Sequence, residues 1–298
     1  IMVVTGVQTC ALPIFNFPVC VEILPIEDLD ASTNWHAALL GVEFVVHTSA
    51  RVHVMSETAK DPLVEFRKVN VEGTLNLARQ AAAAGVKRFI FISSIKVNGE
   101  STLPGKPFSA HDAPAPKDAY GVSKLEAEKG LYRLAASTGM EVVIIRPVLV
   151  YGPRVRANFL SMMQWLSKGI PLPLGAVHNQ RSLVSLENLI SLIVACINHP
   201  RAANQTFLVS DGQDISTEHL LKKLASALGK PARLMPVPVW LMHGVAVLLG
   251  RRDLSSRLFG SLQVDISKNR ELLGWTPPVS LDQGLRLTAQ HFLESRNS

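Results

Sequence analysis

The 298-residue sequence has few cysteines, no dense basic block and no long apolar run, and each absence argues against a class of protein. Its three cysteines, Cys10, Cys20 and Cys196, show no paired spacing, so neither a disulfide framework nor a zinc site is expected. The net charge of +6 is spread along the chain, which argues against nucleic-acid binding and favours a small anionic substrate. The longest apolar run, Leu241 to Leu249, is far shorter than the ~20 residues of a membrane span, so we expect a buried helix there.

The first residues also lack the glycine-rich turn with which a dinucleotide-binding domain opens. Thr5-Gly6 imitates the start of such a turn, but residues 7–13 contain no further glycine and Pro13 would break the following helix. Gly6 is therefore not expected to contact a pyrophosphate. Residues 4–14, VTGVQTCALPI, resemble a translated sequencing-library adapter, so we interpret residues 1–14 as a non-native leader and leave them out of the fold prediction. A signal peptide is not favoured, because no basic region precedes the apolar residues.

Short apolar runs alternate with helix-like stretches over the first half of the chain. Strands are expected at residues 21–24, 42–47, 88–93 and 142–146, and helices at 73–84 and 124–137. This alternation predicts an α/β fold with a doubly wound parallel sheet, Rossmann-like and missing its first β-α-β unit. Prolines punctuate the chain beyond Gly152. We therefore predict a truncated dinucleotide-binding domain over 15–152 and a smaller C-terminal substrate lobe over 153–298.

One pair of residues suggests acid–base chemistry. Tyr120 and Lys124 are four residues apart, so on a helix the phenol and the ammonium share one face. A tyrosine that shuttles protons near neutral pH needs its pKa lowered from about 10 by roughly three units, and a neighbouring cation supplies part of that. Alone, this spacing is more typical of a solvated helix face. Here it follows an apolar strand that ends in Ser93-Ser94, where open parallel sheets present groups to ligands.

At this point the sequence resembles the extended short-chain dehydrogenase/reductase family, in its NAD-dependent epimerase/dehydratase branch. The matching segments are VVHTSARVHV (45–54), VNVEGTLNLARQA (69–81), FIFISSIKVNGE (89–100), YGVSK (120–124), IIRPVLVYGP (144–153), RSLVSLENL (181–189) and SKNRELLGW (267–275). Within that branch the chain looks similar to bacterial surface-polysaccharide enzymes that reduce or epimerise C4 of a UDP-linked N-acetylhexosamine.

The resemblance implies three catalytic residues. Tyr120 would be the acid–base, Lys124 would hold the nicotinamide ribose and lower the tyrosine pKa, and Ser94 would donate a hydrogen bond to the C4 oxygen. Ser93 is the alternative serine, unless its hydroxyl merely caps the strand. In the commonest sugar epimerases the position of Asn98 is a tyrosine; the amide could contact sugar or cofactor, or simply occupy a turn.

The resemblance also implies a cofactor, NAD or NADP, and the residues that would contact it. These are Asp28 and Leu29 at the adenine, Thr48, Ser49 and Ala50 along the pyrophosphate and ribose, Asn70, Tyr120 and Lys124, and Pro147 with Val148 near the nicotinamide. Asp28 has a rival role as a helix N-cap. His47 reads as a packed core histidine rather than a ligand. For the UDP-sugar, the implied contacts are Ser94, Asn158, Arg181 and Arg257, since a diphosphate favours planar guanidinium groups.

The expected reaction is hydride exchange at C4, by either a 4-ketoreductase or a 4-epimerase, in surface-polysaccharide precursor synthesis. Two alternatives stay open: a non-catalytic dinucleotide-binding regulator, and an inactive fragment of the enzyme. We expect a cytoplasmic protein with no membrane span, no metal and no nucleic-acid partner, and leave a homodimer open. The sequence does not decide between NAD and NADP, between the two reactions, or among the sugars.

Overall fold

The computed structural model describes residues 2–4, 24–26, 28–52, 61–103, 105–248 and 259–297. Its main sheet is parallel, with the strand order β1-β2-β3-β4-β7. This sheet consists of β1 (Met2–Val4), β2 (Phe44–His47), β3 (Arg88–Ile92), β4 (Glu141–Pro147) and β7 (Gln205–Val209). A smaller sheet has the order β5-β6-β8 and consists of β5 (Leu149–Tyr151), β6 (Arg181–Ser185) and β8 (Asp214–Ile215).

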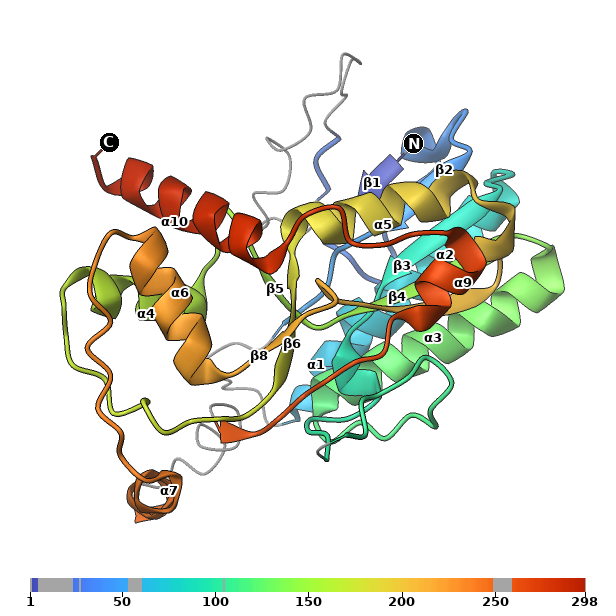
Figure 1. Cartoon of the computed structure of the whole chain (residues 1–298). Coiled ribbons are helices and arrows are strands. Elements are labelled where there is room, and N and C mark those ends of the chain that lie inside the picture. Colours follow the sequence, from blue (N-terminus) through green and yellow to red (C-terminus); the bar gives the residue numbers. More distant parts are fainter. Residues whose placement is uncertain are drawn as a thin grey trace.

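Helices cover both faces of the main sheet (Figure 1). One face packs against α2 (Thr74–Ala83) and α3 (Ala119–Thr138), and the other against α5 (Leu186–Asn198) and α9 (Ser267–Leu273). Because side chains alternate along a strand, Phe89 and Phe91 enter the layer of α2 and α3, whereas Ile90 enters the layer of α5. Burial of both faces is the reason that the central strands are apolar at successive positions.

A second lobe lies beside the sheet, on the left of Figure 1. Its helices share a separate apolar core with β6 and are α4 (Ala157–Ser167), α6 (Thr217–Ala227), α7 (Val239–Leu248) and α10 (Leu281–Asn297). The remaining helical elements are short and are η2 (Ala37–Leu39), α1 (Pro62–Arg67), η3 (Lys68–Gly73), η4 (Ile95–Val97) and η5 (Pro200–Ala202). No helix in the described ranges is both long and apolar enough to cross a bilayer.

The predicted α/β architecture with a parallel sheet is confirmed, and so are its central elements. The strands expected at 42–47, 88–93 and 142–146 are β2, β3 and β4, and the two expected helices are α2 and α3. Of the strand expected at 21–24, only Leu24 lies among the described residues, and it belongs to no strand. A single boundary after Gly152 does not describe the chain, because β7, α5 and α9 return from the C-terminal half to the main sheet.

The start of the chain differs from the expectation. Met2–Val4 form strand β1, which pairs in parallel with β2 from Met2 opposite Val45 to Val4 opposite His47. Three residues of the proposed leader therefore belong to the main sheet. The physical reason is that an apolar, extended tripeptide satisfies backbone groups that the edge of β2 would otherwise leave unpaired. Residues 5–23, which include Gly6 and the rest of the proposed leader, lie outside the described residues.

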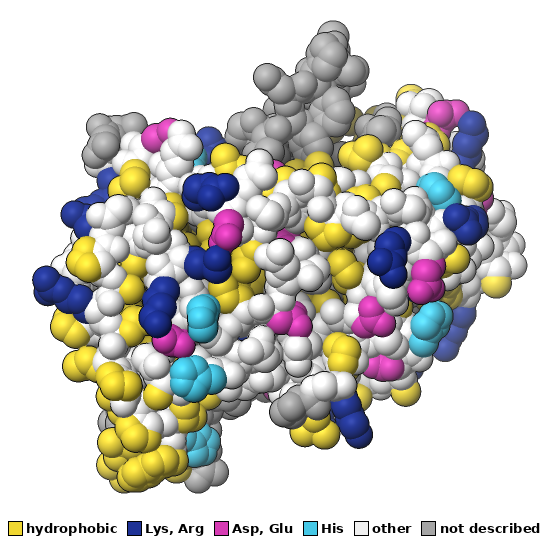
Figure 2. All heavy atoms as spheres, in the orientation of Figure 1, with side chains coloured by type: hydrophobic (Ala, Val, Ile, Leu, Met, Phe, Trp, Pro, Cys, Tyr) yellow, Lys and Arg dark blue, Asp and Glu magenta, His cyan; other side chains and the backbone are white. Residues whose placement is uncertain are grey.

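Helix α7 is the second difference. A helix forms where the apolar run predicts one, but it is not buried: Trp240 is 75% exposed, Leu241 45% and Leu248 86%. In the space-filling view, apolar side chains gather where α7 projects from the lower left of the molecule (Figure 2). Length and hydropathy predicted the helix. They could not predict its partner, because burial depends on what the rest of the chain places against it.

Candidate functional site

Helix α3 carries Tyr120 in its first turn and Lys124 one turn later. The helix begins there because Asp118 caps it, its carboxylate accepting a hydrogen bond of 2.8 Å from the Gly121 amide. The Lys124 side chain is buried, and its Nζ donates 2.9 Å to the Ile92 carbonyl at the end of β3. That Nζ also lies 4.4 Å from the centroid of the Phe91 ring and 6.0 Å from that of Tyr120. The acid–base face of α3 is thus anchored to the carboxyl end of β3.

Ser94 completes this group from the segment that follows β3. It has an extended backbone at the start of η4, and its Oγ accepts a hydrogen bond of 3.3 Å from the Lys96 amide. The same side chain lies close enough to the Tyr120 phenol to act on it as a hydrogen-bond donor would, which lowers the pKa of the phenol. The structure therefore brings together Ser94, Tyr120 and Lys124, the three residues predicted to be catalytic.

The ionisation of the pair differs from the prediction. Burial, aided by the negative charge of Asp118, raises the pKa of Tyr120 to about 12, against the hydrogen bond from Ser94. Burial also lowers the pKa of Lys124 to about 7, although Glu128 opposes the change. The expectation that Lys124 lowers the pKa of Tyr120 is therefore wrong for the protein without a ligand. Burial penalises both charged forms, and at neutral pH the phenol is a proton donor.

Directly behind these residues lies a buried ion pair between Glu128 of α3 and Arg146 of β4. Arg146 donates to both carboxylate oxygens, at 3.0 Å from Nε and 2.5 Å from Nη2. Ser93 donates 2.5 Å to the same carboxylate, so its hydroxyl is directed away from the Ser94 side of the strand. The network ties the ends of β3 and β4 to the helix that carries Tyr120.

Asn98 belongs to this network. Its Oδ1 accepts 2.9 Å from Arg146 Nη1 and its Nδ2 donates 3.0 Å to the Ser109 carbonyl, so the amide is used for structure. Sequence reasoning missed Glu128 altogether. The available signal was its spacing, eight residues after Tyr120 and four after Lys124, because a carboxylate on a buried helix face requires a partner.

The residues predicted along the cofactor follow β2. Thr48 and Ala50 are half-buried and Ser49 is buried. Asn70 lies in η3, a single π-helical segment, which is a feature frequent at functional sites. Its side chain accepts 2.8 Å from the Arg51 amide and donates 3.0 Å to Ser123 Oγ, which links the segment after β2 to α3. Pro147 and Val148, at the end of β4, are both buried.

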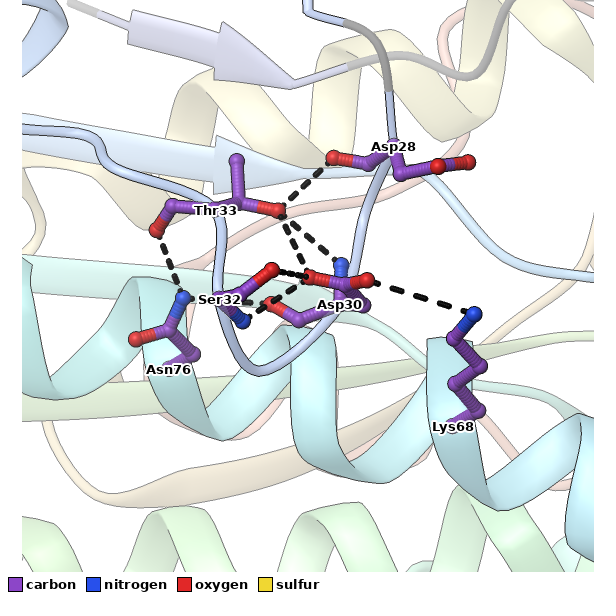
Figure 3. Close-up of polar contacts among 6 residues, drawn as sticks. All are labelled: Asp28, Asp30, Ser32, Thr33, Lys68 and Asn76. Atoms are coloured by element: carbon purple, nitrogen blue, oxygen red, sulfur yellow. Dashed lines mark hydrogen bonds and ion pairs between the residues drawn. The ribbon is translucent and has the colours of Figure 1, made fainter.

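The predicted adenine contacts lie in a loop that α2 and η3 hold in place (Figure 3). Asn76 Nδ2 donates to the backbone carbonyls of Asp30, at 3.1 Å, and Thr33, at 2.7 Å, and Lys68 is 4.0 Å from the Asp30 carboxylate. The Asp28 side chain is exposed and points away from these contacts. Its rival role as a helix N-cap is wrong, because the next described helical element is η2, whose N-cap is His36.

Leu29, the second predicted adenine contact, lies against η3. A Cβ atom on Gly73 would be 2.7 Å from the Leu29 carbonyl oxygen, so only glycine allows the two backbones to approach this closely. The position of the loop is therefore fixed by backbone packing as well as by the hydrogen bonds of Asn76.

The predicted substrate residues are not all placed. Asn158 is exposed in the first turn of α4. Arg181 opens β6, its Nη1 donates 3.2 Å to the Gly260 carbonyl, and burial lowers the pKa of its guanidinium. Arg257 lies outside the described residues. Contacts among the described residues do not join Asn158 or Arg181 to the Ser94–Tyr120 pair.

His47, at the end of β2, is a buried core histidine, as predicted. Its Nε2 is 2.9 Å from Thr74 Oγ1, and its ring stacks on Phe91 at a centroid distance of 5.7 Å. Burial, followed by the nearby Lys124 charge, lowers the pKa of His47 to about 3. In the unfolded chain the histidine pKa is about 6.5, so the unfolded state binds more protons between these values.

His47 should therefore make the fold sensitive to acid. Its contribution to stability is complete above pH 6.5 and is lost as the pH falls toward 3, with about 3 kcal/mol lost by pH 4.5. Urea unfolding at pH 7.5 and 4.5 measures the loss. The variant His47→Gln should lose less stability over this range than the unmodified protein, while the exposed His36→Gln should behave as the unmodified protein does. Equal losses in all three would contradict the assignment.

Comparisons with known proteins agree with this architecture. A UDP-glucose 4-epimerase of Vibrio cholerae is 55% identical over 276 residues, covering 92% of this chain and 84% of that protein. An N-acetyl-alpha-D-glucosaminyl-diphospho-ditrans,octacis-undecaprenol 4-epimerase of Escherichia coli O157:H7 is 27% identical, covering 91% and 83%. Among solved structures, UDP-glucuronic acid 4-epimerase from Bacillus cereus in complex with NAD superposes with a TM-score of 0.73 at 22% identity, covering 90% of this chain and 78% of that one.

A family model also matches most of the chain. Residues 20–210 match the model of the NAD dependent epimerase/dehydratase family, which includes the Ser94, Tyr120 and Lys124 positions. The predicted family, the prediction of an enzyme and the general cofactor prediction are confirmed by this match and by the 55% identical relative. The name of that relative is UDP-glucose 4-epimerase, which is not the name of an N-acetylhexosamine reductase. This chain belongs to the NAD dependent epimerase/dehydratase family.

Proposed function

We propose that this protein is a 4-epimerase of a UDP-linked hexose, with Tyr120 as acid–base and Ser94 as hydrogen-bond donor to the C4 oxygen. The observation that carries the proposal is the convergence of the Ser94 hydroxyl, the Tyr120 phenol and the buried Lys124 amine at the end of β3. A relative 55% identical over 92% of the chain bears the name UDP-glucose 4-epimerase, which favours epimerisation over reduction.

The described residues fit one end of NAD. Lys124 is a buried amine that carries three N–H donors when protonated, and it donates to the Ile92 carbonyl, an arrangement that suits ribose hydroxyls. Ser49 and Asn70 border the same strand ends. NAD supplies hydride acceptance and return at C4, and the positive charge of its oxidised ring favours the phenolate.

The chain's own residues would then handle the proton. Tyr120 accepts the C4 hydroxyl proton as the carbinol becomes a ketone and returns it when the carbinol re-forms, while Ser94 holds that oxygen in place throughout. The high pKa of Tyr120 suits the return step directly, since a protonated phenol faces the ketone at neutral pH. Arg181, oriented by the Gly260 carbonyl, is our candidate for the UDP diphosphate, with Asn158 beside the sugar and Arg257 as a further candidate.

An N-acetylated sugar is the second candidate substrate. The observation that favours it is the 27% identical relative, which is named as a 4-epimerase of a lipid diphosphate-linked N-acetylglucosamine. Asn98 does not favour either sugar over the other, because its side-chain amide is already hydrogen-bonded to Arg146 and to the Ser109 carbonyl.

The test is to incubate the protein with UDP-galactose or UDP-N-acetylgalactosamine and a catalytic amount of NAD. We expect the C4 epimer to form many times in excess of the NAD added, with no net accumulation of NADH at 340 nm. Stoichiometric consumption of NADH with a 4-keto sugar would instead identify a ketoreductase. Binding of NAD without turnover of any sugar would support the regulator, and absence of NAD binding would support the inactive fragment.

A further inference from the structure

Helix α7 presents an apolar face that no described part of the chain covers. Val239 and Met242 pack against the core of the second lobe, so one side of the helix is fixed to the protein. Trp240 and Leu248 lie on the opposite side, since eight residues span about two turns, with exposed fractions of 75% and 86%. Leu241 and, just before the helix, Met235 are exposed by 45% and 46%.

This exposure is unusual for such a sequence. The helix contains no Asp, Glu, Lys or Arg, and a helix that is apolar all round is normally buried. Contiguous exposed apolar side chains mark an interaction surface with a partner or a membrane. Figure 2 shows apolar side chains gathered on a projection at the lower left edge of the molecule, where Figure 1 places α7.

Basic residues predominate in the sequence around α7, where the first acidic residue after the helix is Asp253. Residues 219–252 contain no aspartate or glutamate. Within them, the exposed Lys230 and Arg233 precede the helix and form no ion pair in the described part of the chain, and Arg251 and Arg252 follow it in the sequence. A second copy of this surface would bring like charges together, which disfavours self-association. An anionic membrane fits both features: its headgroups attract the basic side chains, and its hydrocarbon boundary receives the apolar face.

From these observations we infer that α7, together with Lys230 and Arg233 before it, binds the surface of an anionic membrane. The ten-residue helix lies in the plane of the interface with Trp240, Leu241 and Leu248 among the lipid chains and headgroups, a position typical of tryptophan. Lys230 and Arg233 contact the headgroups. The second lobe is thereby held at the bilayer, without a spanning segment and without any role for the Ser94–Tyr120 site.

Vesicle flotation of the full chain tests the inference without an activity assay. Vesicles that contain phosphatidylglycerol should carry the protein upward, vesicles of phosphatidylcholine alone should carry much less, and salt should weaken the binding. The double variant Trp240→Ser with Leu248→Ser should weaken binding at least about tenfold, because two large apolar side chains no longer leave water. Lys230→Glu with Arg233→Glu should remove the preference for anionic vesicles.

The matched control is Leu40→Ser with Leu103→Ser. The side chains of Leu40 and Leu103 lie away from α7 in the sequence and are 70% and 67% exposed. It should bind vesicles as the unmodified protein does. Because all of these side chains are exposed, Tm should stay unchanged in every variant. The inference is overturned if anionic vesicles do not carry the protein. It is also overturned if the Trp240→Ser, Leu248→Ser variant binds these vesicles as well as the Leu40→Ser, Leu103→Ser control does. It is also overturned if light scattering finds a dimer that the Trp240 variant dissociates while vesicles bind neither form.

Discussion

The variant Tyr120→Phe is expected to lower the turnover of the C4 epimerisation by roughly 10²- to 10⁴-fold, the range that positioned acid–base groups contribute. The substitution removes the hydroxyl near Ser94 and leaves the ring, which packs edge-on against Phe66 at a centroid distance of 6.0 Å. Binding of NAD and the Tm should therefore change little. Product formation followed by chromatography of the nucleotide sugars gives kcat.

The same helix offers a matched control. Tyr132 is also on α3, and its phenol is hydrogen-bonded to Thr206 Oγ1 at 2.7 Å, on the side of β7. Tyr132→Phe removes the same atom from the same helix and should leave kcat within about twofold, since the group takes no part in proton transfer. If the two variants have similar kcat values, Tyr120 is not the acid–base of this enzyme.

Breaking the ion pair behind the site has the largest expected effect on stability. Arg146→Met should lower the free energy of unfolding by about 3–5 kcal/mol, because the Glu128 carboxylate then stays buried without a cation. The variant also removes the donor to Asn98 Oδ1, so the segment after β3 loosens. Urea unfolding measures the change.

An exposed ion pair provides the comparison. Lys87 and Glu43 are 2.6 Å apart, but their side chains are 65% and 58% exposed, so Lys87→Met should cost less than about 1 kcal/mol. Combining Arg146→Met with Glu128→Leu should recover much of the loss, since no buried charge is left alone. If Arg146→Met costs no more than Lys87→Met, the buried pair does not hold the ends of β3 and β4 to α3.

The central strands and the helix of Tyr120 could be predicted because their signals are local. Strands buried on both faces have apolar residues at successive positions, as in 89–92, and Asp118 caps α3 at the point where the helical pattern begins. The proximity of Ser94 to Tyr120 followed from topology: Ser94 comes directly after β3 at the carboxyl edge of the sheet, and α3, the next helix in the chain, begins near that edge.

Other features depend on contacts with distant parts of the chain, and local sequence patterns do not identify the partners in those contacts. Strand β1 forms because β2 has an open edge, and α7 is exposed because no described element covers it. The pKa of Tyr120 could not be predicted from its spacing to Lys124, because burial lowers the pKa of the lysine itself. The ion pair of Glu128 and Arg146 joins residues from two separate elements, which one sequence does not connect.

The most direct test of the central claim uses UDP-galactose that carries deuterium at C4. If Tyr120 moves only the hydroxyl proton and NAD returns the hydride it accepts, the UDP-glucose formed will keep its deuterium at C4 in ordinary water. Nuclear magnetic resonance of the product reads this out. Replacement of the deuterium by solvent hydrogen would contradict hydride return at C4, and with it the role assigned to the group of Ser94, Tyr120 and Lys124.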